Sequence, residues 1–227
     1  MTWPDVVSRP VVLVPVGSTE QHGPHLPFDA DTAIAVSVAH AVASKLGSHV
    51  VVAPAINYGA SGEHQAFPGT ASIGADVLRL VVVELVRSLS TWAGQVVLIN
   101  AHGGNVSALS KAVLQLVAEQ HNIAWVPCTS EGADLHAGVT ETALMLHIRP
   151  QSVRLDRARP GETRPIADIL PALIAGGVAS VSATGVLGDP RGATAAEGRR
   201  LLELMSADCR KRIEDGVLNE RGMLVRR

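Results

Sequence analysis

Short apolar runs alternate with longer segments of helical periodicity along most of the chain. The apolar runs predict buried strands at Val11–Val16, Val50–Ala53, Val96–Asn100 and Ile123–Cys128. The segments that follow these runs predict helices over Asp31–Leu46, Ala75–Ser90, Val106–His121 and Thr140–Ile148. Because strands alternate with helices, the pattern predicts an α/β fold in which a mostly parallel sheet is covered by helices on both faces.

The last third of the chain predicts two further features. The residues Thr-Ala-Ala-Glu at 194–197 form a capping-box pattern that opens a helix running through Ile213. The uncharged stretch Ile169–Gly188 is long enough to cross a bilayer. Its Pro171 and several glycines instead favour a short helix, a glycine turn and a strand. We therefore expect no membrane span, and a single domain over residues 1–227 with a three-layer α/β/α sandwich.

Composition narrows the classes of function. The chain has 227 residues, of which 47% are hydrophobic and 18% charged, so it can bury one sizeable core. A net charge of -2 without a long basic run argues against a nucleic-acid partner. Two cysteines cannot build a disulfide framework or a cysteine-rich zinc site. The first ten residues lack the pattern of a signal peptide, which predicts a cytoplasmic protein.

The polar residues with the most chemical interest follow the predicted strands. In parallel α/β sheets, ligands bind beyond the carboxyl ends of the strands. The loops that leave those ends are Gly17–Ala30, Ile56–Thr70, Ala101–Asn105 and Thr129–Val139. We therefore expect one functional site, built from these four loops and the helix starts that they lead into.

The first of these loops carries candidate metal ligands. Glu20 and His22 lie two residues apart, so in an extended segment both side chains point to one side. Asp31 follows at the predicted helix start, and carboxylates with imidazoles are typical ligands of divalent metals. Alternatively, Asp31 is a helix N-cap and Glu20 a surface residue. The prolines and glycines that fix the shape of this loop favour the metal site.

The third and fourth loops add further candidates. His102 ends a buried strand and is followed by Gly103 and Gly104, which leave open space beside a metal ligand. The alternatives are a glycine-rich anion loop, for which no P-loop lysine follows, or a structural histidine. His136 and Glu141 flank a helix start, where one could bind metal and the other move protons. Alternatively, Glu141 only faces the helix dipole.

Four motifs, in their order and spacing, resemble the creatininase (creatinine amidohydrolase) family. They are STEQHGPHLPFDAD, SGEHQAFPGTAS, NAHGGN and HAGVTET, and GVLGDPRGATAAEG is a further similar segment. Within this family the chain is most similar to the creatininase-like peptidases of mycofactocin biosynthesis. The resemblance implies a metal-dependent amidohydrolase with two divalent metal ions per chain, for which Zn, Fe and Mn are all suitable.

The ligands implied by this resemblance divide into two sets. Glu20, Asp31 and His102 would hold one metal, while His22 and the bridging Asp31 would hold the other. In creatininase the second metal takes a further carboxylate, at the position that is Gly104 in this sequence. We expect Glu141 to supply the missing ligand.

The resemblance also implies roles in catalysis and substrate binding. A metal-activated water would attack the amide carbonyl, and His136 would protonate the leaving amine. The residues expected on the substrate side are Ser61, Glu63, His64, Gly103 and Gly104. Glycines at 103 and 132 replace bulky groups near the creatinine ring, and Gly104 replaces a carboxylate. The sequence therefore predicts a wider pocket and a larger substrate.

The leading hypothesis is therefore a peptidase that releases a C-terminal dipeptide from a modified mycofactocin precursor peptide. The alternatives are a hydrolase of small formamides or of creatinine, and a non-catalytic metal-binding module. The expected partner is a peptide or small amide substrate. The family resemblance further implies a homo-oligomer, similar to a hexamer.

Overall fold

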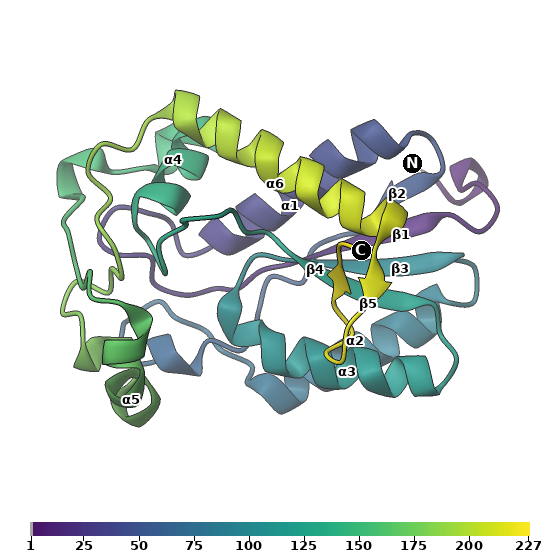
Figure 1. Cartoon of the computed structure of the whole chain (residues 1–227), viewed down its shortest axis with the longest axis horizontal. Helices are drawn as coiled ribbons and strands as arrows, with labels where there is room; N and C mark the ends of the chain where they lie inside the picture. Colours follow the sequence, from purple (N-terminus) through teal and green to yellow (C-terminus); the bar gives the residue numbers. More distant parts are fainter. Residues whose placement is uncertain (1) are drawn as a thin grey trace.

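A four-stranded parallel sheet lies at the centre of the computed structural model, which describes residues 2–227. Its strands are β1 (Val11–Val16), β2 (Val50–Val52), β3 (Gln95–Asn100) and β4 (Ile123–Pro127), in the spatial order β2-β1-β3-β4 (Figure 1). Most residues of β1, β3 and β4 are buried. Near-continuous burial is what a sheet covered on both faces requires.

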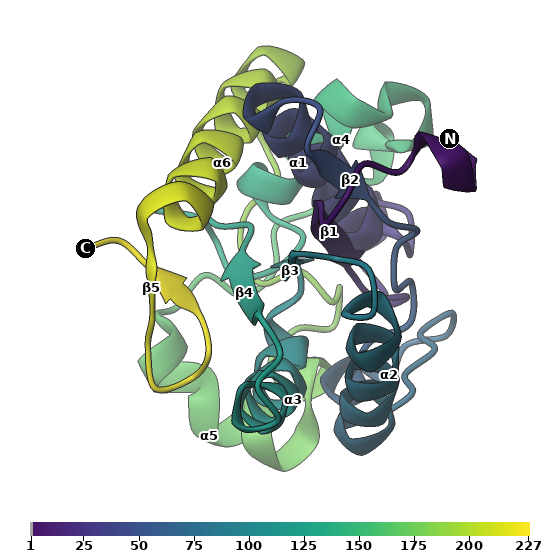
Figure 2. The same ribbon diagram turned by 90° about the vertical axis from the view of Figure 1, so that its right-hand side faces the viewer.

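Helices cover both faces of this sheet. On one face lie α1 (Ala30–Leu46), α4 (Val139–Ile148) and α6 (Ala195–Asp215), and on the other α2 (Ala75–Leu89) and α3 (Val106–Ala118). Figure 2 shows α1 and α6 above the strands and α2 and α3 below them. A separate apolar core fills each of the two interfaces. The predicted three-layer α/β/α sandwich is confirmed.

The strand register brings the four predicted loops together. Val16 at the end of β1 pairs with Asn100 at the end of β3, and Asn100 pairs with Pro127 at the end of β4. Val16 also forms an isolated bridge with Ile56, in the segment that follows β2. All four loops therefore begin side by side at one edge of the sheet.

The segment Ile169–Gly188 differs from its prediction. The helix is present as α5 (Ile166–Gly176), but among the described residues no strand lies between its end and Gly188. Leu187 forms only a two-bond bridge with the backbone of His136, and Gly185, with φ of 77°, interrupts the extended backbone just before it. None of the helices among residues 2–227 combines the length and apolar character needed to span a membrane.

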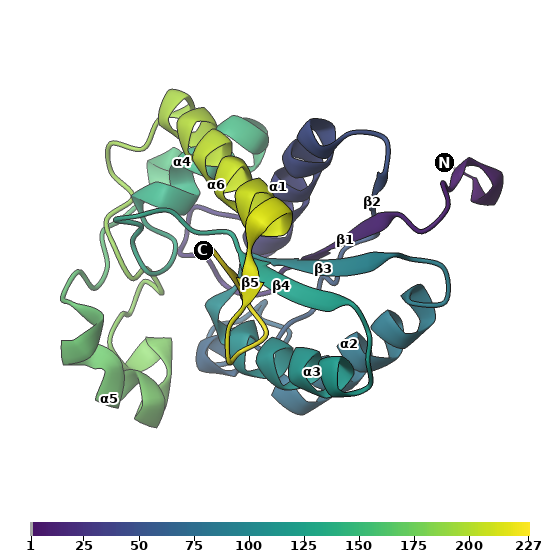
Figure 3. The ribbon, with the colours of Figure 1, turned by 45° about the vertical axis from the view of Figure 1, so that its right-hand side comes forward.

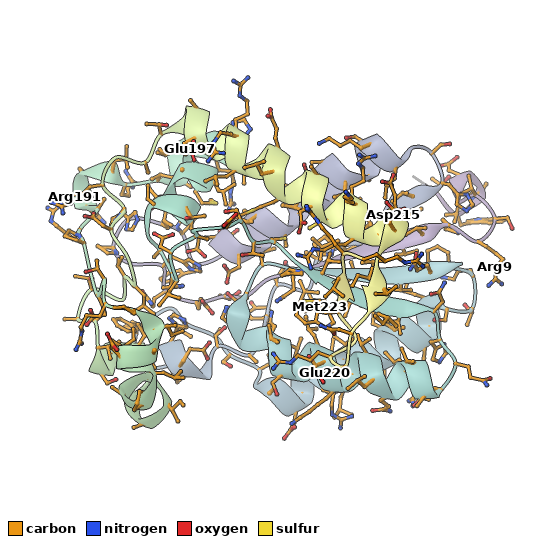
Figure 4. The ribbon with its side chains drawn as sticks, in the orientation of Figure 1. Arg9, Arg191, Glu197, Asp215, Glu220 and Met223 are labelled. Atoms are coloured by element: carbon orange, nitrogen blue, oxygen red, sulfur yellow. The ribbon has the colours of Figure 1, made fainter. Side chains whose placement is uncertain are left out.

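The predicted capping box at the start of α6 is half formed. The backbone N–H of Glu197 donates to the Thr194 hydroxyl at 3.2 Å. The Glu197 carboxylate does not accept a hydrogen bond from the backbone N–H of Thr194, because it binds Arg200 one turn later in the helix. Figure 4 labels Glu197 at this end of α6. The helix itself begins where the sequence predicted.

A C-terminal hairpin, which was not predicted, covers the exposed edge of β4. Its strands are β5 (Val217–Leu218) and β6 (Leu224–Val225). Trp125 of β4 bonds to the turn of this hairpin and forms a bridge with Met223, which Figure 4 labels. Covering an edge strand in this way makes it less open to pairing with another chain.

Candidate metal centre

The five predicted metal ligands meet at the carboxyl edge of the sheet. Glu20 and His22 come from the loop between β1 and α1, and both are fully buried. Asp31 lies in the first turn of α1, His102 directly follows β3, and Glu141 lies in the first turn of α4. Residues that are far apart in the sequence thus converge at one point.

Asp31 faces two imidazoles with its two oxygens. Its Oδ1 lies 3.2 Å from Nε2 of His22, and its Oδ2 lies 3.3 Å from Nδ1 of His102. The Ser18 hydroxyl also donates to Oδ2 at 2.7 Å. Burial opposes ionisation, yet His22 and His102 hold the pKa of Asp31 well below its usual range. Asp29, not Asp31, occupies the N-cap position of α1, so capping does not explain Asp31.

Glu20 is a buried carboxylate whose oxygens accept no hydrogen bond. Its Oε2 lies 3.3 Å from Nε2 of His102, while its Oε1 lies 3.2 Å from Nε2 of His64 and 3.7 Å from Nδ1 of His136. Burial raises the pKa of Glu20 to about 7, and the Asp31 carboxylate adds to this. A carboxylate without partners is costly to bury unless a cation binds it.

Backbone carbonyls orient three of the imidazoles. A carbonyl can only accept, so it fixes the N–H of each ring on the nitrogen that faces it. The second nitrogen of each ring, namely Nε2 of His22, Nδ1 of His102 and Nδ1 of His136, then faces the carboxylates of the cluster. The carbonyl partners, at 3.1, 3.1 and 2.8 Å, belong to Glu20, Ala60 and Gln21 respectively. This arrangement is typical of metal-binding histidines.

Gln21 gives His64 the opposite orientation. The Gln21 Oε1 accepts the N–H of Gly23 at 2.8 Å, so its amide nitrogen must be the donor to the Gly185 carbonyl at 3.0 Å. The same nitrogen donates to Nδ1 of His64 at 2.8 Å, because a neutral ring can accept there. Burial lowers the pKa of His64 to about 3, with His102 adding to the effect. His64 therefore carries its proton on Nε2, facing Glu20.

Glu141 completes the metal cluster, which we define as Glu20, His22, Asp31, His102 and Glu141 with the neighbouring His64 and His136. Its Oε2 accepts the N–H of Ala137 at 2.6 Å and lies 3.8 Å from Nε2 of His22. Ligand atoms of His22, His136 and Glu141 all lie within 4.8 Å of one another. Burial raises the pKa of Glu141 to about 7. A second group, Glu20, Asp31 and His102, meets the same distance limit.

The glycines predicted to widen the pocket behave differently from one another. A Cβ added at Gly103 would meet open space. One added at Gly104 would collide with the Ala60 carbonyl and with Oε1 of Glu63. The Glu63 carboxylate, 3.6 Å from Nε2 of His102, thus occupies the position where a side chain at 104 would begin. Gly132 does not line the cavity and instead borders a separate surface hollow.

A cavity of about 900 Å³ opens above the cluster. Four of the five predicted substrate-side residues line it, namely Glu63, His64, Gly103 and Gly104. Ser61 does not, because it is fully buried with its hydroxyl 3.5 Å from Nε2 of His102. Two parts of the site were not predicted from the sequence: Gln21, which bonds to His64, and the apolar side chains of α5, which form one wall of the cavity. Gln21 lies within the first motif, and α5 shows helical spacing of apolar residues.

The side chains of the cluster suit divalent metal ions. Three overlapping groups of three ligand atoms share one region, the third being Glu20, His64 and His136. The Glu20 oxygens accept no hydrogen bond, and carbonyls orient the imidazoles as metal sites require. His136, whose pKa burial and His22 hold well below the usual range, presents a neutral nitrogen beside them. Carboxylates and imidazoles together suit Zn, Fe or Mn.

Comparisons with known proteins agree with this arrangement. A family model described as "Creatininase: Creatinine amidohydrolase" matches residues 1–213. The "Mycofactocin precursor peptide peptidase" of Mycobacterium ulcerans is 50% identical over 231 residues, covering 99% of this chain and 90% of that protein. That of Mycolicibacterium smegmatis is 51% identical over 220 residues, covering 95% and 89%.

Solved structures give the same result for the fold. A crystal structure of creatinine amidohydrolase (creatininase) matches with a TM-score of 0.73 and 27% identity, covering 91% of this chain and 92% of that one. A mutant creatininase described as the Zn-Zn type matches with a TM-score of 0.70 and 28% identity, covering 87% of both chains. With a family match over most of its length and relatives of about half identical sequence, the chain belongs to the creatininase (creatinine amidohydrolase) family.

Proposed function

We propose that the protein is a metal-dependent peptidase that releases a C-terminal dipeptide from a modified mycofactocin precursor peptide. The observation that carries the proposal is the buried group of Glu20, Asp31 and His102 at the floor of a cavity of about 900 Å³. Cavities of this size accommodate ligands much larger than creatinine. The names of the relatives at 50% and 51% identity support the choice of substrate.

Two metal ions per chain, Zn, Fe or Mn, form part of this proposal. Glu20, Asp31 and His102 would hold the first ion. His22, Asp31 and Glu141 would hold the second, with Glu141 in place of the carboxylate that Gly104 lacks. The two oxygens of Asp31, which face His22 and His102 separately, support a bridging role.

The residues around the cluster would supply the proton transfers. The bound metals would polarise the amide carbonyl and activate the attacking water. The free Nδ1 of His136 would take a proton from that water and deliver it to the nitrogen of the leaving amine. The Nε2–H of His64 points into the same site and would donate to the carbonyl oxygen as negative charge develops there.

Replacement of His136 by Ala tests this function directly. A positioned general acid contributes about 10²–10⁴ in rate, so kcat for precursor-peptide cleavage should fall by that factor while both metals remain. The exposed His147 on α4 provides the matched control, and its Ala variant should keep full activity. Loss of a metal from His136→Ala would instead identify His136 as a ligand, and unchanged turnover would refute the mechanism.

The same assay separates this function from its alternatives. Formamides and creatinine should be poor substrates of the metal-loaded protein relative to the precursor peptide. Failure of all three substrates would favour a non-catalytic metal-binding module. Homo-oligomeric assembly and a cytoplasmic location remain predictions from the sequence and the family resemblance.

A further inference from the structure

One wall of the cavity comes from a helix that contributes no ligand to the metal cluster. Four apolar side chains of α5 line this wall: Ile166, Leu170, Leu173 and Ile174. Their spacing of four, three and one places them on one face of the helix. Ile166, Leu170 and Ile174 are 48%, 44% and 78% exposed, so packing within the chain does not account for their apolar character.

The helix α5 is fixed to the protein at Ile169 and at its C-terminal end. Ile169 is buried, with 1% exposure, and Gly177 ends the helix directly against the backbone of Glu63. A Cβ at Gly177 would collide with the Glu63 carbonyl, so the two segments are in contact. Figure 3 shows α5 at the end of the molecule beyond the sheet. The apolar face is therefore held beside Glu63 and His64, in the same cavity as the metal cluster.

The cavity offers little to a charged substrate group beyond the cluster itself. No lysine or arginine is among the described residues that line it. Arg164, two residues before α5, donates to both carboxylate oxygens of Glu162, at 3.0 Å to Oε1 and 2.6 Å to Oε2. Binding energy at this wall would therefore come from burial of apolar surface.

We propose that this face of α5 is the subsite for a large apolar side chain, aliphatic or aromatic, beside the amide bond that is cleaved. The proposal rests on the proposed function, since that function places the amide above Glu20 and His102. A substrate is a better occupant than a second copy of the chain, because the apolar face and the metal cluster line one continuous cavity.

Binding of small amides tests the subsite without requiring turnover. N-acetyl amides of Phe, Leu, Ala and Asp would be titrated into zinc-loaded protein, with affinity followed by NMR. The Phe and Leu amides should bind about 10-fold or more tightly than the Ala and Asp amides. Leu170→Ser should remove that preference. The control is Leu114→Ser on α3, because Leu114 is 45% exposed, close to the 44% of Leu170, but does not line the cavity.

Turnover then links the subsite to cleavage. In Leu170→Ser, kcat/KM for the precursor peptide should fall about 10- to 100-fold with metal content unchanged. Equal affinity for all four amides, or equal losses in both variants, would overturn the subsite. A change in oligomer mass with no change in amide affinity would overturn it too, and would assign this face to contact between copies. A binding preference without peptide cleavage would support the subsite and refute the proposed peptidase.

Discussion

Asp31 presents each carboxylate oxygen to a different imidazole, a geometry that predicts distinct effects for two neighbouring variants. His22 lies near Oδ1 and His102 near Oδ2. If Asp31 bridges two metals, Asp31→Ala should abolish the binding of both. His22→Ala should remove only one, because Glu20 and His102 remain for the other. Metal analysis of the purified variants measures this directly, and two metals per chain in Asp31→Ala would refute the bridge.

The hydrogen bonds of Gln21 predict that its replacement slows catalysis, although Gln21 binds no metal. Gln21→Glu keeps the shape of the side chain but cannot donate to Nδ1 of His64 or to the Gly185 carbonyl. His64 would then lose the bond that keeps its proton on Nε2. Because lost buried hydrogen bonds cost about 1–3 kcal/mol, kcat should fall about 5- to 100-fold with metal content retained.

The nitrogen NMR shifts of the His64 ring separate this effect from general damage. They should report Nε2–H in the wild-type protein and a changed tautomer in Gln21→Glu. The matched control is Gln65→Glu, since Gln65 also lines the cavity but is exposed. If His64 keeps its tautomer while activity falls, Gln21 acts only through stability.

The sequence predicted which residues gather at the cluster better than it predicted how they are oriented. Glu20, His22, Asp31, His102 and Glu141 each follow a strand or begin a helix, and parallel strands bring such positions to one edge. The tautomers of the histidines could not be inferred, because they depend on carbonyls such as that of Ala60. The sequence also could not reveal that a side chain fills the space beside Gly104, because Glu63 reaches that space from a different loop.

At the scale of elements, burial explains why most predicted strands and helices are present and why one predicted strand is absent. The strands and the helices that pack on them follow from apolar runs and helical periodicity, and their bounds differ by only a few residues from those predicted. The expected strand before Gly188 is absent because Leu187 pairs with His136 in a single bridge, not along a run. Several apolar residues of the segment 169–188 lie on α5 and line the cavity. Their apolar character therefore reflects ligand binding as much as folding.

For the molecule as a whole, the proposed metals would cross-link elements that the apolar core on one face of the sheet already packs together. Glu20 and His102 lie in the loops after β1 and β3, and Glu141 lies in the first turn of α4, so the two proposed metals would link these three elements. Metals that bind the folded chain alone stabilise it by about 4 kcal/mol at a 1,000-fold excess over Kd. For a protein of this size each kcal/mol shifts Tm by about 2–4 °C. Chelation should therefore lower Tm by about 10 °C or more in calorimetry, whereas Asp31→Ala should not respond.

The Glu20→Gln variant shows, in the same experiment, how much the buried Glu20 charge destabilises the metal-free fold. Burial raises the pKa of Glu20 to about 7 and the Asp31 carboxylate adds to this, which means that the ionised carboxylate destabilises the metal-free fold above that pH. Glu20→Gln removes the buried charge while keeping the side-chain shape, so the metal-free variant should be at least as stable as metal-free wild type near pH 8. Its Tm should rise less than that of the wild type when zinc is added, because one ligand is lost. A metal-free Glu20→Gln protein clearly less stable than the metal-free wild type would mean that Glu20 supports the fold itself, through contacts with His64 and His102, and not chiefly through a cation.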